Sequence, residues 1–205
     1  MNERTFEEPD KRLRWLARSL YGPRGHLHDQ TQGFTEYSTR MLGDMGDNPV
    51  YDLVGSERDV LLAYLNKMRN AVVRTSEGLT AEQQRSPGVP SGTNLLGLIQ
   101  HLTGVEQHWF QRVFLGEDRE TNDSMDVPVG MTGDKIVAAY REACAQSDEI
   151  VRACPDLSTL AQVVNPGEDK RDSLRSIVAH MIEETARHAG HADILREQID
   201  GATGL

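Results

Sequence analysis

The chain has 205 residues, which suits one domain of ordinary size with a single core. Hydrophobic residues make up 38% and charged residues 26%, a profile typical of a soluble globular protein. The net charge of -10 argues against nucleic acid as a partner, and no apolar run approaches the roughly 18 residues that span a bilayer. The charged start MNERTFEEPDKRLRW lacks the apolar core of a signal peptide, so we expect a cytoplasmic protein with no membrane partner.

Residues 1 to 55 are expected to form an N-terminal extension, separate from a domain at residues 56 to 205. Within the extension, KRLRWLARSLYG and TEYSTRML are compatible with short helices, so the segment is predicted to be partly helical. His26 and His28 make a pair in GHLHDQ, but neither a carboxylate nor a periodic helix accompanies them. They are therefore a weak candidate for a metal site.

The first long helix is predicted in SERDVLLAYLNKMRNAVVRTSEGL, with Ser56 as its N-cap and Gly78 as its stop. Its apolar positions follow the i, i+4, i+7, i+11 spacing of one helical face, and they are Leu61, Leu65, Met68 and Val72. The next stretch, TAEQQRSPGVPSG, is rich in proline, glycine and serine and is expected to be a loop.

The second helix is predicted in TNLLGLIQHLTGVEQHWFQRVFLG, and Gly116 ends it. Its apolar side holds Leu95, Leu98, Leu102, Val105, Trp109 and Val113. The polar stretch that follows, EDRETNDSMDVPVGMTG, has no periodic pattern.

The third helix is predicted in DKIVAAYREACAQSDEIVRAC, which Pro155 stops. The fourth runs from about Ser173 to Ile199, and Gly201 ends it. Four long amphipathic helices with little alternating strand pattern predict an all-α protein, a four-helix bundle with an N-terminal extension. Cys144 and Cys154 do not form a CxxC pair and are expected to be free thiols.

A carboxylate and an imidazole lie inside the apolar stripe of the fourth helix. At about 100° per residue, this stripe holds Leu174, Ile177, Met181, Glu184, His188, Ala192 and Leu195. Glu183 points nearly the opposite way and should be solvated. Because a buried carboxylate is costly unless it is paired or binds a metal, Glu184 and His188 are candidate metal ligands.

The second helix offers His101, at the border of its apolar arc, as a third ligand. Two histidines and one carboxylate leave positions open for water or substrate, as catalytic metal sites do. The alternative is that the E-x-x-x-H spacing arises by chance, as it does in many helices. His180 and His191 lie at the edges of the fourth-helix stripe, where each is either a substitute ligand or a hydrogen-bonded surface histidine.

The stretches LLGLIQHLTGVEQHWFQRVF and LRSIVAHMIEETARHAGHADILREQIDG resemble the DinB/YfiT-like superfamily of bacterial four-helix proteins. They are most similar to its actinobacterial branch, which is related to mycothiol-dependent enzymes, and the resemblance covers roughly residues 57 to 201. It implies a DinB-like bundle that holds a divalent metal between helices through His101, Glu184 and His188. Many relatives have histidine at the position of Glu184, whereas mycothiol-dependent maleylpyruvate isomerases are similar to this chain in using glutamate.

The resemblance implies a metal-dependent thiol S-transferase, in which the metal binds mycothiol or a similar small thiol for attack on an electrophilic molecule. Zinc is the expected ion, with nickel or another divalent ion as alternatives. Glu106 and His191 are candidates for ligand orientation or proton transfer, and Trp109 and Phe110 for the substrate pocket or plain core. Two other functions stay open, a metal-dependent hydrolase and a non-catalytic metal-binding stress-response protein. A homodimer is also possible.

Overall fold

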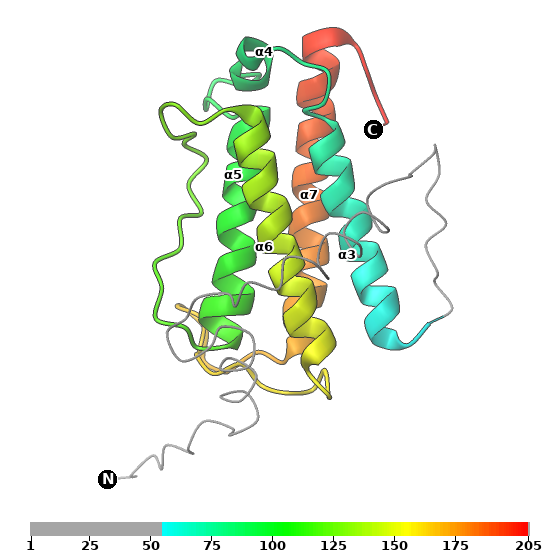
Figure 1. Ribbon diagram of the computed structural model, residues 1–205, viewed down its shortest axis with the longest axis vertical. Helices are drawn as coiled ribbons and strands as arrows, with labels where there is room; N and C mark the ends of the chain where they lie inside the picture. The colour runs from blue at the N-terminus through cyan, green and yellow to red at the C-terminus, as the bar shows by residue number, and fades with distance from the viewer. Residues whose placement is uncertain (1–54, 205) are drawn as a thin grey trace, which may run out of the picture. The chain divides into compact units, whose positions relative to one another are not determined.

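The computed structural model describes residues 55–204. The predicted extension, apart from Gly55, lies outside these residues, as do its two short helices and the pair His26 and His28. The described residues form helices and no strand: α3 (Glu57–Arg74), α4 (Ala81–Arg85), α5 (Leu95–Glu106), the π-helix η2 (Gln107–Phe114), α6 (Gly133–Ala153) and α7 (Leu174–Asp200). The predicted all-α fold with four long helices is confirmed (Figure 1).

The predicted helix ends follow from local chemistry. Ser56 caps α3 by accepting a hydrogen bond from the backbone of Asp59, whose side chain bonds back to Ser56. The Ser173 side chain caps α7 by accepting a hydrogen bond from the backbone amide of Ser176. Gly201 ends α7 with a φ of 80°, a conformation that favours glycine. The third helix stops at Ala153, two residues before Pro155.

The four long helices pack so that α3 and α5 each lie against both α6 and α7. Glu57 and Arg175 form an ion pair where α3 and α7 begin, and Arg196 bonds the Thr75 carbonyl where both end, so these two helices run the same way. The helices α5 and α6 run in the opposite direction (Figure 1). Because α5 and α6 are parallel, the chain between them must return along the bundle. Residues 117–131, here called the strap, make this return beside α5.

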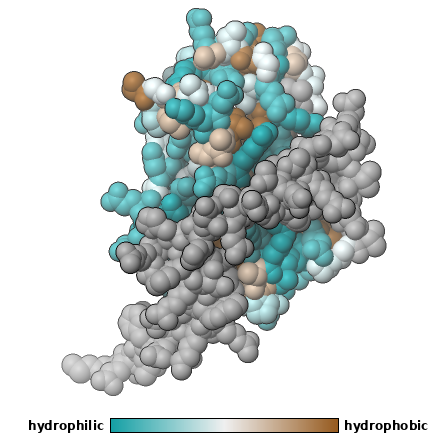
Figure 2. Space-filling view, viewed as in Figure 1, coloured by the Kyte–Doolittle hydropathy of each residue, from teal (hydrophilic) through white to brown (hydrophobic). Residues whose placement is uncertain are grey.

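The core lies between the four helices, and polar residues predominate on the visible described surface (Figure 2). One cluster joins α3, α5 and α6, and contains Val72, Val73, Leu96, Ile99, Leu102, Ile136 and Tyr140. A second cluster joins α5 to α7, and contains Leu95, Leu98, Ala192 and Leu195. Among the described helices, none has the length and apolar character needed to cross a membrane.

The second helix is not a single α-helix to Gly116, as the sequence predicts. After Glu106 it continues as a π-helix, in which the Leu115 amide bonds the Phe110 carbonyl five residues back. At about 100° per residue, Trp109 would lie roughly 80° around the helix from His101. The wider π turns rotate each residue by less, so Trp109 turns toward the face that carries His101.

The inner face of α3 is also shifted from its predicted position. Leu65 and Val72 are buried as expected, but Leu61 and Met68 are only half-buried. Leu62 and Arg69 take the buried positions beside them. A charged residue therefore lies in the core.

Candidate metal centre

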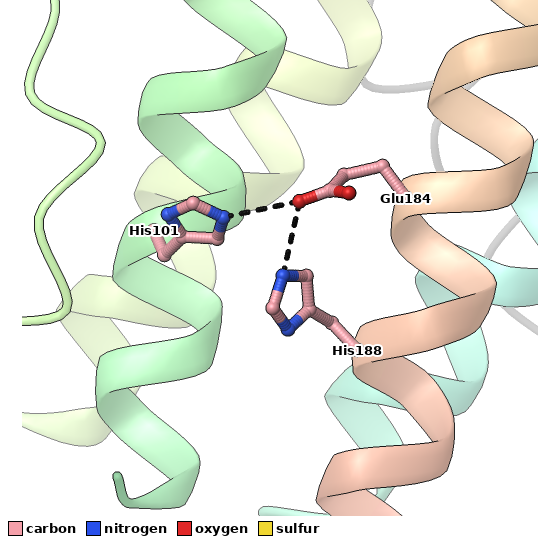
Figure 3. A group of neighbouring side chains, drawn as sticks. All are labelled: His101, Glu184 and His188. Atoms are coloured by element: carbon pink, nitrogen blue, oxygen red, sulfur yellow. Dashed lines mark hydrogen bonds and ion pairs between the residues drawn. The ribbon is translucent and has the colours of Figure 1, made fainter. Parts of the chain in front are cut away.

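Three side chains from two neighbouring helices converge between α5 and α7. His101 extends from α5, whereas Glu184 and His188 lie one turn apart on α7 (Figure 3). The Nε2 atoms of His101 and His188 lie 3.3 and 3.0 Å from the same carboxylate oxygen, Oε1 of Glu184. Ligands about 2.0–2.2 Å from a zinc ion are roughly 3.3–3.6 Å apart in a tetrahedral site. One donor atom from each residue lies within 4.8 Å of the others, so the spacing is close to that of a ligand set.

The helical phase predicted for α7 is confirmed by the exposure of its side chains. Met181, Ala192 and Leu195 are buried on the stripe that Glu184 and His188 share. The Glu184 side chain is 13% exposed, whereas that of its neighbour Glu183 is 68% exposed. The trio of His101, Glu184 and His188 therefore lies mostly out of solvent, where a carboxylate needs a partner.

A backbone carbonyl fixes the orientation of His101. Nδ1 of the ring contacts the carbonyl oxygen of Asp123, which belongs to the strap. A carbonyl can only accept a hydrogen bond, so Nδ1 carries the hydrogen and Nε2 of the neutral ring keeps its lone pair. This lone pair faces Oε1 of Glu184, itself an acceptor, and the contact is favourable only with a proton or a cation between the two atoms.

Glu184 is held as an anion. Burial alone would raise its pKa, but the polar and charged groups around the carboxylate, among them the Arg187 guanidinium, outweigh burial and bring the pKa below the usual value. Nη1 of Arg187 donates to Oε2 of Glu184 at 2.7 Å. One carboxylate oxygen is thus bonded to arginine, and the other is left for the imidazoles.

His188 is held as a neutral ring. Burial lowers its pKa, and this effect exceeds the opposing attraction of the Glu184 carboxylate. Its Nδ1 lies 3.4 Å from Nδ1 of His191, which is exposed on the next turn of α7. Donation from His188 Nδ1 to His191 would leave Nε2 of His188 free to bind a metal. Metal-ligating histidines commonly donate a hydrogen bond from their other ring nitrogen to such a partner. The donor set of two neutral imidazoles and one carboxylate fits a divalent cation.

A family model described as mycothiol-S-transferase matches residues 60–201. The match covers more than half of the chain and includes both helices that carry the trio. The chain belongs to the mycothiol-S-transferase family. This confirms the predicted relation to mycothiol enzymes, and makes the chain a mycothiol-related transferase with a small thiol as its partner. No curated protein is similar enough to the chain to add a second comparison.

The two aromatic residues predicted for the substrate pocket of this transferase differ in their surroundings. Trp109 is half-buried, and its ring lies 4.8 Å from that of His180, centroid to centroid. His180 precedes Glu184 by four residues, so the Trp109–His180 pair lies about 6 Å along α7 from the trio. Phe110 has no exposed surface and is a core side chain. Of the two, Trp109 is the one that is not fully buried.

The candidate Glu106 makes its hydrogen bonds away from the trio. It is fully buried, and both its carboxylate oxygens accept hydrogen bonds of 2.7 Å from Arg69 of α3. Arg69 also donates to Asp148 of α6 at 2.7 Å, so the three residues form a buried ion cluster that joins three helices. Both oxygens of Glu106 are thus occupied, which argues against the predicted role in ligand orientation or proton transfer. Arg69 and Asp148 are not among the residues predicted from the sequence.

Within residues 55–204, three further histidines lie near the trio but are not among its converging donors. His108 has both ring nitrogens near polar groups, Asn165 Oδ1 at 2.9 Å and Thr121 Oγ1 at 3.4 Å. His180 contacts Trp109 rather than Glu184, so neither candidate substitute ligand displaces a member of the trio. His191 reaches His188, but it is not among the converging donors.

Proposed function

We propose that the protein is a metal-dependent thiol S-transferase and that His101, Glu184 and His188 hold the metal. The convergence of their donor atoms, in a chain of the mycothiol-S-transferase family, carries the proposal. When bound, a divalent ion such as zinc supplies a Lewis acid that lowers the pKa of a thiol and favours the nucleophilic thiolate. The thiolate sulfur then bonds an electrophilic carbon, the leaving group departs with its electron pair, and the thiol proton passes to solvent.

The residues of the chain support this chemistry in distinct ways. Glu184 contributes the single negative charge of the trio, so a divalent ion held there would keep a net positive charge suited to an anionic sulfur. His191 accepts from His188 Nδ1 and orients that ring toward the metal. Trp109 of η2 contacts His180, which lies one turn before Glu184 on α7, and its ring offers an aromatic wall for the substrate. With three converging protein donors, a bound ion would have room for a small molecule, which favours catalysis over a purely structural metal.

The protein's own cysteines are poor candidates for the nucleophile. Burial raises the pKa of the Cys144 thiol well above its usual range, which keeps the sulfur protonated. Cys154 is buried, and its thiol bonds the carbonyl of Asp156. Both are free thiols, as predicted, and a reactive sulfur would therefore come from a bound small molecule. Zinc as the native ion, the cytoplasmic location, the domain boundary at residue 56 and a homodimer stay predictions.

Histidine variants test the metal ligands. His101→Ala should lose most of the bound divalent metal while the bundle still folds, because it removes one of three donors. His108→Ala is the matched control, since His108 bonds Asn165 and Thr121 and should leave metal content unchanged. Elemental analysis of the two purified variants measures their metal content. Equal metal content in both would contradict His101 as a ligand.

The reaction class is tested by omitting one component at a time. The protein is incubated with mycothiol and an alkylating electrophile, and the conjugate is measured by mass spectrometry. Conjugation should require both the thiol and the metal, and removal of the metal with a chelator should abolish it. Consumption of the electrophile at the same rate without any thiol would instead support a metal-dependent hydrolase.

Replacement of Trp109 by alanine should raise KM with little change in kcat. The ring is expected to contact the substrate in the ground state and the transition state alike, so its loss weakens uniform binding. Steady-state kinetics with the same thiol and electrophile measure the effect. A loss confined to kcat would contradict a role of Trp109 in substrate binding.

A further inference from the structure

The strap lies on a face of α5 where one glycine precedes His101 and another follows it. Gly97, His101 and Gly104 follow an i, i+4, i+7 spacing and so share one side of the helix. All three are directed toward the strap: His101 bonds the Asp123 carbonyl, and both glycines lie against strap backbone. The helix therefore presents a shallow face along which a backbone can lie.

Neither glycine could carry a side chain without moving the strap. A Cβ on Gly104 would lie 2.0 Å from the carbonyl oxygen of Asn122 and 2.7 Å from the amide nitrogen of Asp123. A Cβ on Gly97 would lie 2.5 Å from the carbonyl oxygen of Met125. These are backbone atoms, which cannot rotate away as a flexible side chain can. The absence of a side chain at Gly104 thus permits the contact between Asp123 and His101.

The two contacts fit a strap that runs extended along the helix. Between Gly104 and Gly97 an α-helix rises about 10 Å, and the chain from Asn122 to Met125 spans about the same distance when extended. Three strap side chains pack against the two core clusters and hold the strap in this position. They are Met125, Val127 and Met131. The strap is therefore a packed part of the bundle.

A glycine inside a helix costs stability, so its presence needs a reason. Gly104 lies near the middle of the continuous helix formed by α5 and η2, where alanine would ordinarily stabilise the helix. We propose that Gly104 is a positioning residue: it admits the strap backbone, which holds the Asp123 carbonyl on Nδ1 of His101 and keeps Nε2 directed at Glu184 and His188. The consequence for metal binding rests on the proposed function. The effect on the His101 ring does not.

The test compares Gly104→Ala with Gly190→Ala in the full chain. Gly190 lies on α7 close to His188, but a Cβ there would meet no atom within 4 Å, so it controls for a change of glycine alone. In metal-free protein, ¹⁵N spectra of the histidines well above the ordinary pKa of about 6.5 report the ring tautomer. We expect His101 to hold its hydrogen on Nδ1 in the wild type and the Gly190 variant, and to become a tautomer mixture in Gly104→Ala.

Metal affinity, measured by competition between zinc and a chelator, is the second readout. Gly104→Ala should weaken zinc binding by about 10-fold or more, the usual effect of losing the partner that orients a ligating histidine. Where the wild type does bind zinc, an unchanged affinity in this variant, with or without a tautomer change, would overturn the proposal. If the tautomer changes but even the wild type binds no zinc, the positioning role stands and the proposed function fails.

A second variant guards against a folding defect. If Gly104→Ala does not fold, Gly97→Ala carries the test, because it displaces the strap at Met125, two residues from Asp123. We expect the same two changes in smaller measure. An unchanged tautomer and unchanged zinc affinity in a folded Gly97→Ala would overturn the proposal.

Discussion

Replacement of Arg69 by methionine should lower the free energy of unfolding by about 3–5 kcal/mol, the usual cost of removing one partner of a buried ion pair. The side chain of Arg69 is 4% exposed and that of Glu106 is fully buried. Methionine fills a similar volume but donates nothing to Glu106 or to Asp148. The Glu106 carboxylate is then left in the core without its two hydrogen bonds and must either take up a proton or admit water.

Arg152→Met is the matched control for this prediction. Arg152 pairs with the same carboxylate, Asp148, at 3.0 Å, but its side chain is 40% exposed. A partly exposed pair of this kind contributes about 0–1 kcal/mol, so the control should unfold at nearly the wild-type urea concentration. Equal losses in the two variants would contradict the energetic role given to the buried cluster.

A double variant separates the cost of an unpaired charge from the loss of packing. Adding Glu106→Leu to Arg69→Met removes the orphaned carboxylate, and replacement of a buried pair by apolar residues is often neutral or stabilising. The double variant should therefore recover much of the stability that Arg69→Met loses. No recovery would indicate that the ion cluster is required as a whole.

The sequence predicts the fourth helix well because every local signal in it agrees. A serine cap, a terminal glycine and an uninterrupted α-helical period fix the face of α7, so the inward position of Glu184 and His188 follows from counting residues. The same counting fails for α3, where Arg69 occupies a core position. An arginine in an apolar stripe reads as a surface residue unless its buried acids, Glu106 and Asp148, are known to lie opposite on other helices.

The second helix shows what periodicity cannot reach. Its α-helical count holds through His101, which is why that ligand candidate could be found, and it fails from Gln107 because π turns have another period. The strap has no period at all, so its carbonyl contact with His101 is invisible in the sequence. The only available signal was the pair of glycines around His101, whose meaning depends on a backbone that lies against them.

Replacement of Glu184 by glutamine should weaken metal binding by more than about 100-fold and abolish thiol transfer. Even partners that only orient a ligand contribute about 10–100-fold to metal affinity, and Glu184 is proposed to bind the metal itself. Glutamine keeps the shape of the side chain but removes the one negative charge of the trio. His101 and His188 are then left as two neutral ligands, too few for a stable site.

Glu183→Gln is an internal control with the same chemistry one residue away. Both carboxylates bond Arg187, through different guanidinium nitrogens, so each substitution removes one arginine contact. The two residues differ in direction: Oε1 of Glu184 lies near both imidazoles, whereas the Glu183 side chain is 68% exposed. Competition with a chelator should therefore give near wild-type metal affinity for Glu183→Gln, since surface substitutions usually change stability by less than about 0.5 kcal/mol. Similar losses in both variants would mean that the Arg187 contact, and not a ligand at Glu184, determines metal affinity.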